Sequence, residues 1–294
     1  MAKEFKGVIP PVITCFDKDG KFDEKAQREV IDFLTPKVQG FYPVGTYGSG
    51  PLMSFEERKR VAEVVIDEVA GRVPVIVHVG SPNTKQTVAL AKAAEAAGAD
   101  AVGAIPPYYY SYSDADLLEH FRALIASVDI PVFAYNNPGL SGNPLKPALI
   151  RTLADEGLSG LKDSSFDLVT FYKFLDAVDD PAFMHIIGTE AIAAPAIQAG
   201  AKGTVSGLAN VWPELMGELW QSLQKDHARE TAVIQKKVNA ARNVMKYAAT
   251  LVVCYEVLKL RGINAGFPRL PYQPLDAETA KRVKASFTQL GLLS

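Results

Sequence analysis

Short apolar segments alternate with longer amphipathic segments over residues 1–211 of the chain. Most of the short segments are continuously apolar, which is typical of strands buried on both faces of a parallel sheet. Eight of them predict strands, at Gly7–Thr14, Gly40–Val44, Val73–His78, Ala101–Ile105, Pro131–Tyr135, Leu158–Lys162, His185–Ile187 and Gly203–Ser206. Eight strands in a strand–helix rhythm, with no Rossmann-type glycine motif after the first, favour a closed α/β barrel, the (β/α)8 or TIM barrel, over an open doubly wound sheet.

The amphipathic segments carry the signals that begin and end helices. Ser54 and Glu57 form a capping box, and Ser113 is followed by an acidic residue in the first turn. The helical pattern Thr87–Ala97 is followed by Gly98, which predicts a left-handed end cap. Each such helix would return the chain to the start of the next parallel strand.

No strand is predicted after residue 211. Four helices are predicted there instead, at Pro213–Gln224, Ala228–Ala248, Leu251–Arg261 and Ala277–Leu290. We therefore expect a barrel over residues 1–211 and a C-terminal helical extension, residues 212–294, packed on the barrel. The length of 294 residues suits this arrangement, because a barrel of this kind typically takes about 250 residues.

Composition and charge exclude several classes of protein. Apolar residues make up 48% of the chain, charged residues make up 22%, and the formal net charge is −2. This balance is not that of a nucleic-acid-binding protein or of a protein with a polybasic membrane patch. The chain begins with charged residues and lacks an apolar signal core. We expect a cytoplasmic protein with no nucleic-acid and no membrane partner.

Lys162 ends the sixth predicted strand, and the ends of barrel strands form the active site in this fold. A lysine held in an apolar barrel mouth has a lowered pKa, because its charged form is costly to desolvate. The neutral amine can then attack a carbonyl carbon and form an imine. Considered by position alone, a structural pair with the adjacent Asp163 is the alternative interpretation.

Tyr135 ends the fifth predicted strand and would lie beside Lys162, because consecutive strands are neighbours in a barrel. A phenol in this position can transfer protons as the imine forms and breaks down. Considered alone, Tyr135 could equally be a packing residue.

A glycine-rich loop, Gly45–Gly50, follows the second predicted strand. Its backbone N–H groups around Thr46, Tyr47 and Gly48 could bind an anion. The glycine spacing is not that of a nucleotide-binding loop. A tight turn without a ligand is the alternative.

Tyrosines are unusually frequent after the fourth predicted strand, at Tyr108, Tyr109, Tyr110 and Tyr112. So many rings in one loop indicate an interface or a substrate wall rather than a core. We therefore expect a homo-oligomer. A loop folded back on its own rings is the alternative.

The four histidines, at positions 78, 120, 185 and 227, are far apart and form no metal-binding motif. Ser141 and Ser206 lack a histidine–aspartate relay, which disfavours a serine hydrolase. We expect no metal and no cofactor, and we prefer imine chemistry over metal-dependent aldol chemistry.

Together these motifs resemble the N-acetylneuraminate lyase and dihydrodipicolinate synthase superfamily of class I pyruvate aldolases. The resemblance covers essentially the whole chain, through Gly7-Val8-Ile9-Pro10-Pro11, Gly45-Thr46-Tyr47-Gly48, Pro107-Tyr108-Tyr109, Tyr135-Asn136-Asn137-Pro138, Gly160-Leu161-Lys162-Asp163 and Gly203–Asn210. Several motifs in the same order are far more specific than any one of them.

The resemblance implies a role for each candidate residue. Lys162 is the imine-forming lysine and Tyr135 is the proton shuttle. Thr46, with the loop of Tyr47 and Gly48, holds the carboxylate of pyruvate, and Val205 makes an apolar contact to the pyruvyl group. Tyr109 matches a catalytic tyrosine that such enzymes lend to a neighbouring subunit, in a dimer or tetramer.

Three positions depart from the commonest pattern of these enzymes. Tyr47 replaces the usual second threonine or serine of the glycine loop, which alters the proton relay. Leu140 stands where the synthases have an arginine for the carboxylate of their aldehyde substrate, so an uncharged, hydroxylated aldehyde is expected instead. The acidic pair with which sialic acid lyases bind their sugar is reduced to Glu190, followed by Ala191.

The stretch Gly48-Ser49-Gly50-Pro51, with three consecutive tyrosines at Tyr108–Tyr110, resembles the 2-keto-3-deoxygluconate aldolase-like members of the superfamily. The predicted reaction is reversible cleavage of a 2-keto-3-deoxy sugar acid to pyruvate and an aldehyde. The alternatives are a 4-hydroxy-tetrahydrodipicolinate (dihydrodipicolinate) synthase or a related imine-dependent dehydratase. A non-catalytic barrel that binds a small ligand is a further alternative.

Overall fold

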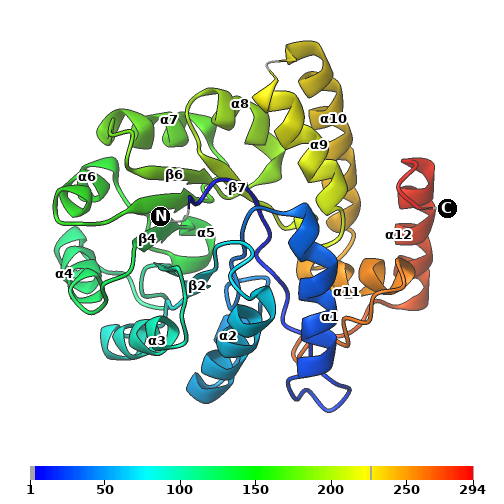
Figure 1. The fold of residues 1–294 in the computed structure, drawn as a ribbon, viewed down its shortest axis with the longest axis horizontal. Coiled ribbons are helices and arrows are strands. Elements are labelled where there is room, and N and C mark those ends of the chain that lie inside the picture. Colours follow the sequence, from blue (N-terminus) through cyan, green and yellow to red (C-terminus); the bar gives the residue numbers. More distant parts are fainter. Residues whose placement is uncertain (1–3, 226, 294) are drawn as a thin grey trace.

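The computed structural model describes residues 4–225 and 227–293, which contain one parallel sheet curled into a barrel (Figure 1). In sheet order the strands are β1 (Gly7–Ile9), β7 (Gly203–Val205), β6 (Met184–Ile187), β5 (Gly160–Asp163), β4 (Val132–Asn136), β3 (Ala101–Ala104) and β2 (Ile76–His78). Every hydrogen-bonded pair of strands is parallel. The predicted fold class, an α/β TIM barrel with C-terminal helices, is confirmed.

The prediction of a full strand at Gly40–Val44 was wrong, because this segment forms a single parallel bridge. The Phe41 N–H donates to the Pro74 carbonyl at 2.9 Å, and the Tyr42 N–H donates to the Pro10 carbonyl at 3.0 Å. The next residue is a proline, which has no N–H, so a regular ladder cannot continue. The segment nevertheless closes the barrel, because its bonds reach the chain beside β1 on one side and β2 on the other.

The helices that follow the strands surround the barrel, and Figure 1 shows α2, α3, α4, α6 and α7 in succession around its outside. They are α1 (Glu24–Leu34), α2 (Phe55–Val69), α3 (Thr84–Ala96), α4 (Asp114–Ile125), α5 (Pro138–Ser141), α6 (Pro147–Asp155), α7 (Leu168–Ala177) and α8 (Ala193–Gln198). The predicted capping box of Ser54 and Glu57 is formed. Helix α3 begins earlier than predicted, because the Asn83 side chain accepts from the Gln86 N–H and caps it.

After the barrel the chain forms α9 (Pro213–Gln224), α10 (Ala228–Met245), α11 (Thr250–Leu260) and α12 (Ala277–Gln289). Helices α10, α11 and α12 lie on one side of the barrel (Figure 1). Helix α10 packs against α9 and against the 3-10 turn Glu190–Ile192 that follows β6. The C-terminal helices thus reach the carboxyl ends of the strands. The division of the chain into a barrel over residues 1–211 and a C-terminal extension over residues 212–294 stays a prediction.

Two clusters of buried side chains make up the core. The larger lies between the sheet and the surrounding helices. The smaller one draws on most of the barrel strands and fills the barrel interior: Phe5, Ile9, Tyr42, Ile76, Ala101, Phe133, Ile186 and Val205. Alternate residues of a strand point to opposite faces, so β1, β2, β3, β4 and β6 each contribute to both clusters.

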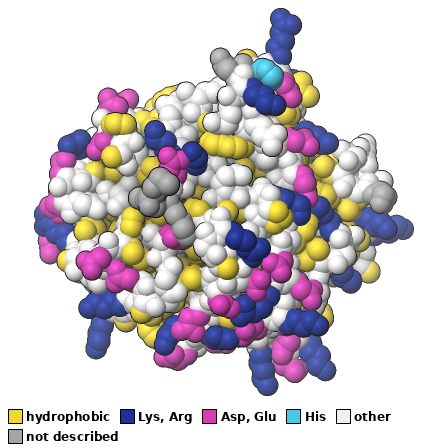
Figure 2. Space-filling model, viewed as in Figure 1, with side chains coloured by type: hydrophobic (Ala, Val, Ile, Leu, Met, Phe, Trp, Pro, Cys, Tyr) yellow, Lys and Arg dark blue, Asp and Glu magenta, His cyan; other side chains and the backbone are white. Residues whose placement is uncertain are grey.

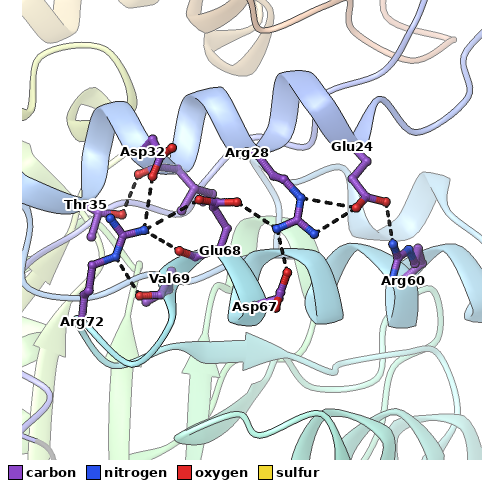
Figure 3. A network of polar contacts seen from close by, with 10 residues as sticks. Glu24, Arg28, Asp32, Thr35, Arg60, Asp67, Glu68, Val69 and Arg72 are labelled. Atoms are coloured by element: carbon purple, nitrogen blue, oxygen red, sulfur yellow. Dashed lines mark hydrogen bonds and ion pairs between the residues drawn. The ribbon is translucent and has the colours of Figure 1, made fainter.

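Helices α1 and α2 are joined by a network of ion pairs on their exposed sides (Figure 3). Arg28 of α1 lies 2.9 Å from Glu24, 2.7 Å from Asp67 and 2.8 Å from Glu68. Arg60 extends the network from α2 back to Glu24 at 2.6 Å. Since these groups are solvent-exposed to differing degrees, each pair contributes at most about 1 kcal/mol to stability.

None of the helices in the described ranges is long and apolar enough to cross a membrane. On the face shown in Figure 2, positive and negative side chains are interspersed. This face therefore lacks the single-sign stripe that is typical of a nucleic-acid-binding surface.

Candidate active site

Lys162 of β5 lies directly opposite Tyr135 of β4 in the sheet register. Only 4% of Lys162 is exposed, and its Nζ lies 3.6 Å from the centroid of the Tyr135 ring. Burial lowers the pKa of Lys162, and the neighbouring Tyr135 offsets part of this effect. A buried amine with a lowered pKa is the arrangement that imine formation requires.

The Tyr135 phenol is held by several polar side chains. The Asn137 Nδ2 donates to the Tyr135 hydroxyl at 2.8 Å, and the Thr46 and Ser164 side chains hydrogen-bond to it as well. Burial by itself raises the pKa of Tyr135. The positive charge of Lys162 and these hydrogen bonds outweigh burial and bring the pKa of the phenol below its usual value. Such a phenol can exchange a proton with a group bound at Lys162.

Both residues line a cavity of about 400 Å³ at the carboxyl ends of the strands. Other side chains of its wall come from the loops that follow the strands and from the C-terminal helices: Thr46, Tyr47, Asn137, Leu140, Ser164, Glu190, Val205, Arg242, Met245, Lys246 and Thr250. A cavity of this size holds a small organic molecule. The structure thus brings five of the seven predicted site residues to one cavity: Lys162, Tyr135, Thr46, Tyr47 and Val205.

Gly48 is not among the residues that line the cavity. A Cβ atom at this position would lie 2.8 Å from the Val44 backbone nitrogen, so only glycine fits. Its carbonyl accepts from the Thr14 hydroxyl at 2.7 Å. Gly48 therefore shapes the turn that presents Thr46 and Tyr47.

The Tyr47 hydroxyl lies against Gly207 and the Thr250 side chain. A Cβ atom at Gly207 would lie 2.1 Å from this hydroxyl, and the Thr250 side chain at the start of α11 hydrogen-bonds to it. Burial, together with the nearby Glu190 carboxylate, raises the pKa of Tyr47. Tyr47 therefore stays protonated and forms part of the cavity wall. The hydrogen bonds of Tyr135 are made by other side chains.

Tyr109 does not line the cavity of its own chain. Its side chain is 87% exposed, its φ of 85° is left-handed, and its ring packs edge-on against Tyr110 at 5.0 Å. An exposed ring of this kind is available for contact with another subunit. The role of Tyr109 in a neighbouring site stays a prediction.

The sequence did not point to the cavity residues of the C-terminal helices, Arg242, Met245, Lys246 and Thr250, and of these Arg242 makes the strongest contact. Its Nε lies 3.1 Å from the Glu190 Oε1, and both side chains are largely buried, at 17% and 8% exposure. The Ser206 hydroxyl donates to the other oxygen of Glu190 at 3.1 Å. The sequence already pointed to Glu190, but nothing in the local sequence marks an arginine on a helix 52 residues later.

The described residues contain no group of three or more His, Cys, Asp or Glu side chains placed to hold a metal ion. The His78 ring lies 6.0 Å from the Tyr135 ring. Burial, reinforced by the charges of Arg58 and Lys162, lowers the pKa of His78. His78 is therefore neutral at physiological pH.

Many enzymes have a TIM barrel with a cavity at the carboxyl ends of its strands. Comparison with known proteins narrows the class of enzyme. Residues 4–290 match the profile of the Dihydrodipicolinate synthetase family. The chain therefore belongs to this family, whose members are class I pyruvate-dependent lyases and aldolases, and it is an enzyme of that class.

Individual relatives differ in their named activities. The chain is 34% identical to a 4-hydroxy-tetrahydrodipicolinate synthase of Methanospirillum hungatei, over 95% of this chain and 97% of the relative. It is 35% identical to the Escherichia coli protein named "Probable 2-dehydro-3-deoxy-D-pentonate aldolase YjhH", over 80% of each. The crystal structure of Escherichia coli YagE in complex with pyruvate superposes with a TM-score of 0.95 at 30% identity, covering 98% of this chain and 99% of YagE.

Proposed function

We propose that this enzyme reversibly cleaves a 2-keto-3-deoxy sugar acid to pyruvate and an aldehyde through a Schiff base on Lys162. The observation that carries the proposal is the buried Lys162 amine, 3.6 Å from the Tyr135 ring centroid and lining the cavity. The alternative role for Lys162, a structural ion pair with Asp163, does not form among the described residues. The Asp163 carboxylate instead accepts from the Asn136 side chain at 2.7 Å and from the Ser165 hydroxyl at 2.7 Å.

In this mechanism the neutral Lys162 amine adds to the keto carbon. The carbonyl oxygen leaves as water after it has taken up one proton from the amine and one from an acid, for which Tyr135 is placed. Tyr135 then accepts the proton of the substrate's C4 hydroxyl as the C3–C4 bond breaks. Backbone N–H groups of the loop at Thr46 and Tyr47 hold the carboxylate, and Val205 contacts the pyruvyl group.

The aldehyde part of the substrate would face the wall formed by Asn137, Glu190 and Thr250. These amide, carboxylate and hydroxyl groups suit an alcohol-bearing chain. Leu140, 57% exposed and lining the cavity, supplies no cation for a carboxylate. The relative named as a pentonate aldolase supports a sugar acid as substrate.

The alternative is a 4-hydroxy-tetrahydrodipicolinate synthase, which the name of the Methanospirillum hungatei relative favours, or a dehydratase with the same imine chemistry. One structural feature also favours the synthase. Arg242 and Lys246 line the cavity, so a carboxylate on the aldehyde could find a cation on α10 in place of the arginine that Leu140 replaces.

A panel of substrates tests the proposal. Pyruvate release from 2-keto-3-deoxy sugar acids, sialic acid and 4-hydroxy-2-oxoglutarate should be fastest with the 2-keto-3-deoxy sugar acids. In the reverse direction, glyceraldehyde should exceed aspartate semialdehyde by at least about tenfold in kcat/KM, the least that a missing charged hydrogen bond costs. A preference for aspartate semialdehyde would establish the synthase activity instead. Absence of any pyruvate adduct on the wild-type protein would favour the remaining alternative, a non-catalytic barrel that binds a small ligand.

A homo-oligomer, dimer or tetramer, and a cytoplasmic location belong to the same proposal. The exposed Tyr109 and Tyr110 side chains support an interface at this loop. Their rings would be shielded from water by a second copy of the chain.

A further inference from the structure

The Lys162 nitrogen lies over the faces of two aromatic rings. The Tyr135 ring centroid is 3.6 Å from Nζ, and the Tyr42 ring centroid is 4.2 Å from it. The two rings meet edge to face, with centroids 6.1 Å apart. Tyr42 comes from the segment that closes the barrel between β1 and β2, and only 1% of it is exposed.

The Tyr42 ring occupies a space that two glycines leave free. A Cβ atom at Gly103 of β3 would lie 2.6 Å from the Tyr42 hydroxyl, and one at Gly45 would lie 3.2 Å from the ring. A side chain at either position would push the ring from its place beside the Lys162 nitrogen. The neighbouring strand and the glycine loop are thus shaped around this ring.

The hydroxyl of Tyr42 takes no part in the site. It is buried and has no hydrogen-bond partner among the described residues. Burial also raises the pKa of Tyr42 well above its usual value, so the phenol neither donates nor accepts a proton in the working range of pH. What Tyr42 offers to Lys162 is therefore the face of its ring.

The face of an aromatic ring is negative and attracts a cation, most strongly where water is excluded. No carboxylate forms an ion pair with Lys162 in the part of the chain that the structure describes. The titratable groups that couple to Lys162 are Tyr135 from β4 and the neutral His78 from β2. The ring faces are thus the main counterpart of a positive charge on this nitrogen.

We propose that the Tyr42 ring stabilises the positive charge that the Lys162 nitrogen carries both as the free ammonium and as the protonated imine. The inference rests on the proposed Schiff base at Lys162. When the imine forms, the amine loses one proton, the keto oxygen leaves as water, and the nitrogen keeps one proton and a positive charge. Since the nitrogen stays attached to the Lys162 side chain, the ring faces it before and after this step.

Replacement of the ring by an apolar chain, Tyr42→Met, tests the proposal. Without the ring the ammonium loses its proton more easily, so the midpoint of the pH profile of adduct formation with pyruvate and cyanoborohydride should fall by about 0.4 to 1.5 pH units. Affinity for pyruvate, measured by calorimetry, should fall about 2- to 30-fold above the midpoint. Below the midpoint it should change little, because a cation is then present both before and after imine formation.

Tyr42→Phe is the conservative variant, because it keeps the ring and removes only the unpartnered hydroxyl. It should retain the wild-type midpoint, and its thermal unfolding should occur at the same or a higher temperature. If Tyr42→Met does not fold, pentafluorophenylalanine at position 42 provides the same comparison with Phe, since fluorine removes the negative charge of the face and preserves the shape.

Two results would overturn the inference. One is that Tyr42→Met, or the variant with pentafluorophenylalanine at position 42, keeps the wild-type midpoint and the wild-type affinity for pyruvate at every pH. The other is a shift in Tyr42→Phe equal to that in Tyr42→Met, which would assign the effect to the hydroxyl. Absence of any adduct on Lys162 in the wild-type enzyme is a different outcome, because it would remove the proposed Schiff base itself.

Discussion

Arg242 and Glu190 form an ion pair that joins helix α10 to the end of β6, with the Arg242 Nε 3.1 Å from the Glu190 carboxylate. The pair lies in the wall of the same cavity as Lys162. A helix that follows the barrel in sequence thus supplies part of the cavity wall at the strand ends.

The first prediction follows from this pair. Arg242→Met should lower kcat/KM for the sugar-acid substrate by about 10- to 150-fold, the usual effect of losing a hydrogen bond between charged groups. Adduct formation with pyruvate alone should stay close to wild type, because the pair faces the aldehyde part. Arg229→Met, on the exposed face of the same helix, is the matched control. Equal losses with pyruvate and with the whole substrate would assign Arg242 a purely structural role.

The covalent step is tested by trapping. Mass spectrometry after treatment with pyruvate and borohydride should place one adduct on Lys162, and Lys162→Ala should give none. An unmodified Lys162 in active enzyme would contradict the mechanism.

The lowered pKa of Lys162 has a consequence for stability with a definite sign. Between the pKa of folded Lys162 and its higher value in the unfolded chain, unfolding takes up a proton. The free energy of unfolding should therefore rise with pH in this window and be lowest below it. Tyr135, whose pKa is also lowered, gives a slope of the same sign. Denaturant unfolding at several pH values should show a smaller slope in Lys162→Met.

Tyr135→Phe should lower turnover by about 10²- to 10⁴-fold, because the variant lacks the proton that the mechanism transfers. Its fold should persist, as circular dichroism and thermal unfolding would show. Tyr172→Phe removes a hydroxyl from a half-exposed tyrosine outside the cavity and serves as control. Turnover near wild type in Tyr135→Phe would make Tyr135 a packing residue.

Gly207 and Tyr47 give a prediction about packing. A Cβ atom at position 207 would lie 2.1 Å from the Tyr47 hydroxyl. Gly207→Ala should therefore lower the free energy of unfolding by about 1–3 kcal/mol, as overpacked sites do. In a Tyr47→Ala background Gly207→Ala should cost less, because that background lacks the hydroxyl, at 2.1 Å, and the ring atom Cζ, at 2.2 Å, that conflict with the new Cβ atom. A stable Gly207→Ala protein would mean that Tyr47 has room to move.

Tyr109 can be tested by mixing two inactive variants. If the tyrosine completes a neighbouring site, Lys162→Ala and Tyr109→Ala chains should each be impaired, and oligomers that contain both should recover part of the activity. Recovery is expected because the Tyr109→Ala chain keeps Lys162 and receives Tyr109 from its neighbour. A fully active monomer in sedimentation would contradict the assembly.

Local patterns in the sequence were sufficient for much of the barrel. Continuous apolar runs predict buried parallel strands because both faces of each strand are covered, and the capping box at Ser54 marks the start of a helix wherever the chain folds. The position of Lys162 beside Tyr135 also follows from sequence, since consecutive parallel strands are neighbours. The strand expected at Gly40–Val44 failed because prolines on and beside it remove the N–H groups that a ladder needs.

Only the tertiary structure decided which distant residues share the site. The Arg242–Glu190 pair, the fit of Tyr47 against Gly207 and the Tyr42 ring beside Lys162 all join segments far apart in the chain. No local periodicity encodes such contacts, because they depend on how the barrel closes and on where the C-terminal helices pack. The sequence by itself determined most of the strands, the lysine and its neighbouring tyrosine. Packing across the closed barrel determined the charge, the shape and the remaining wall of the cavity around them.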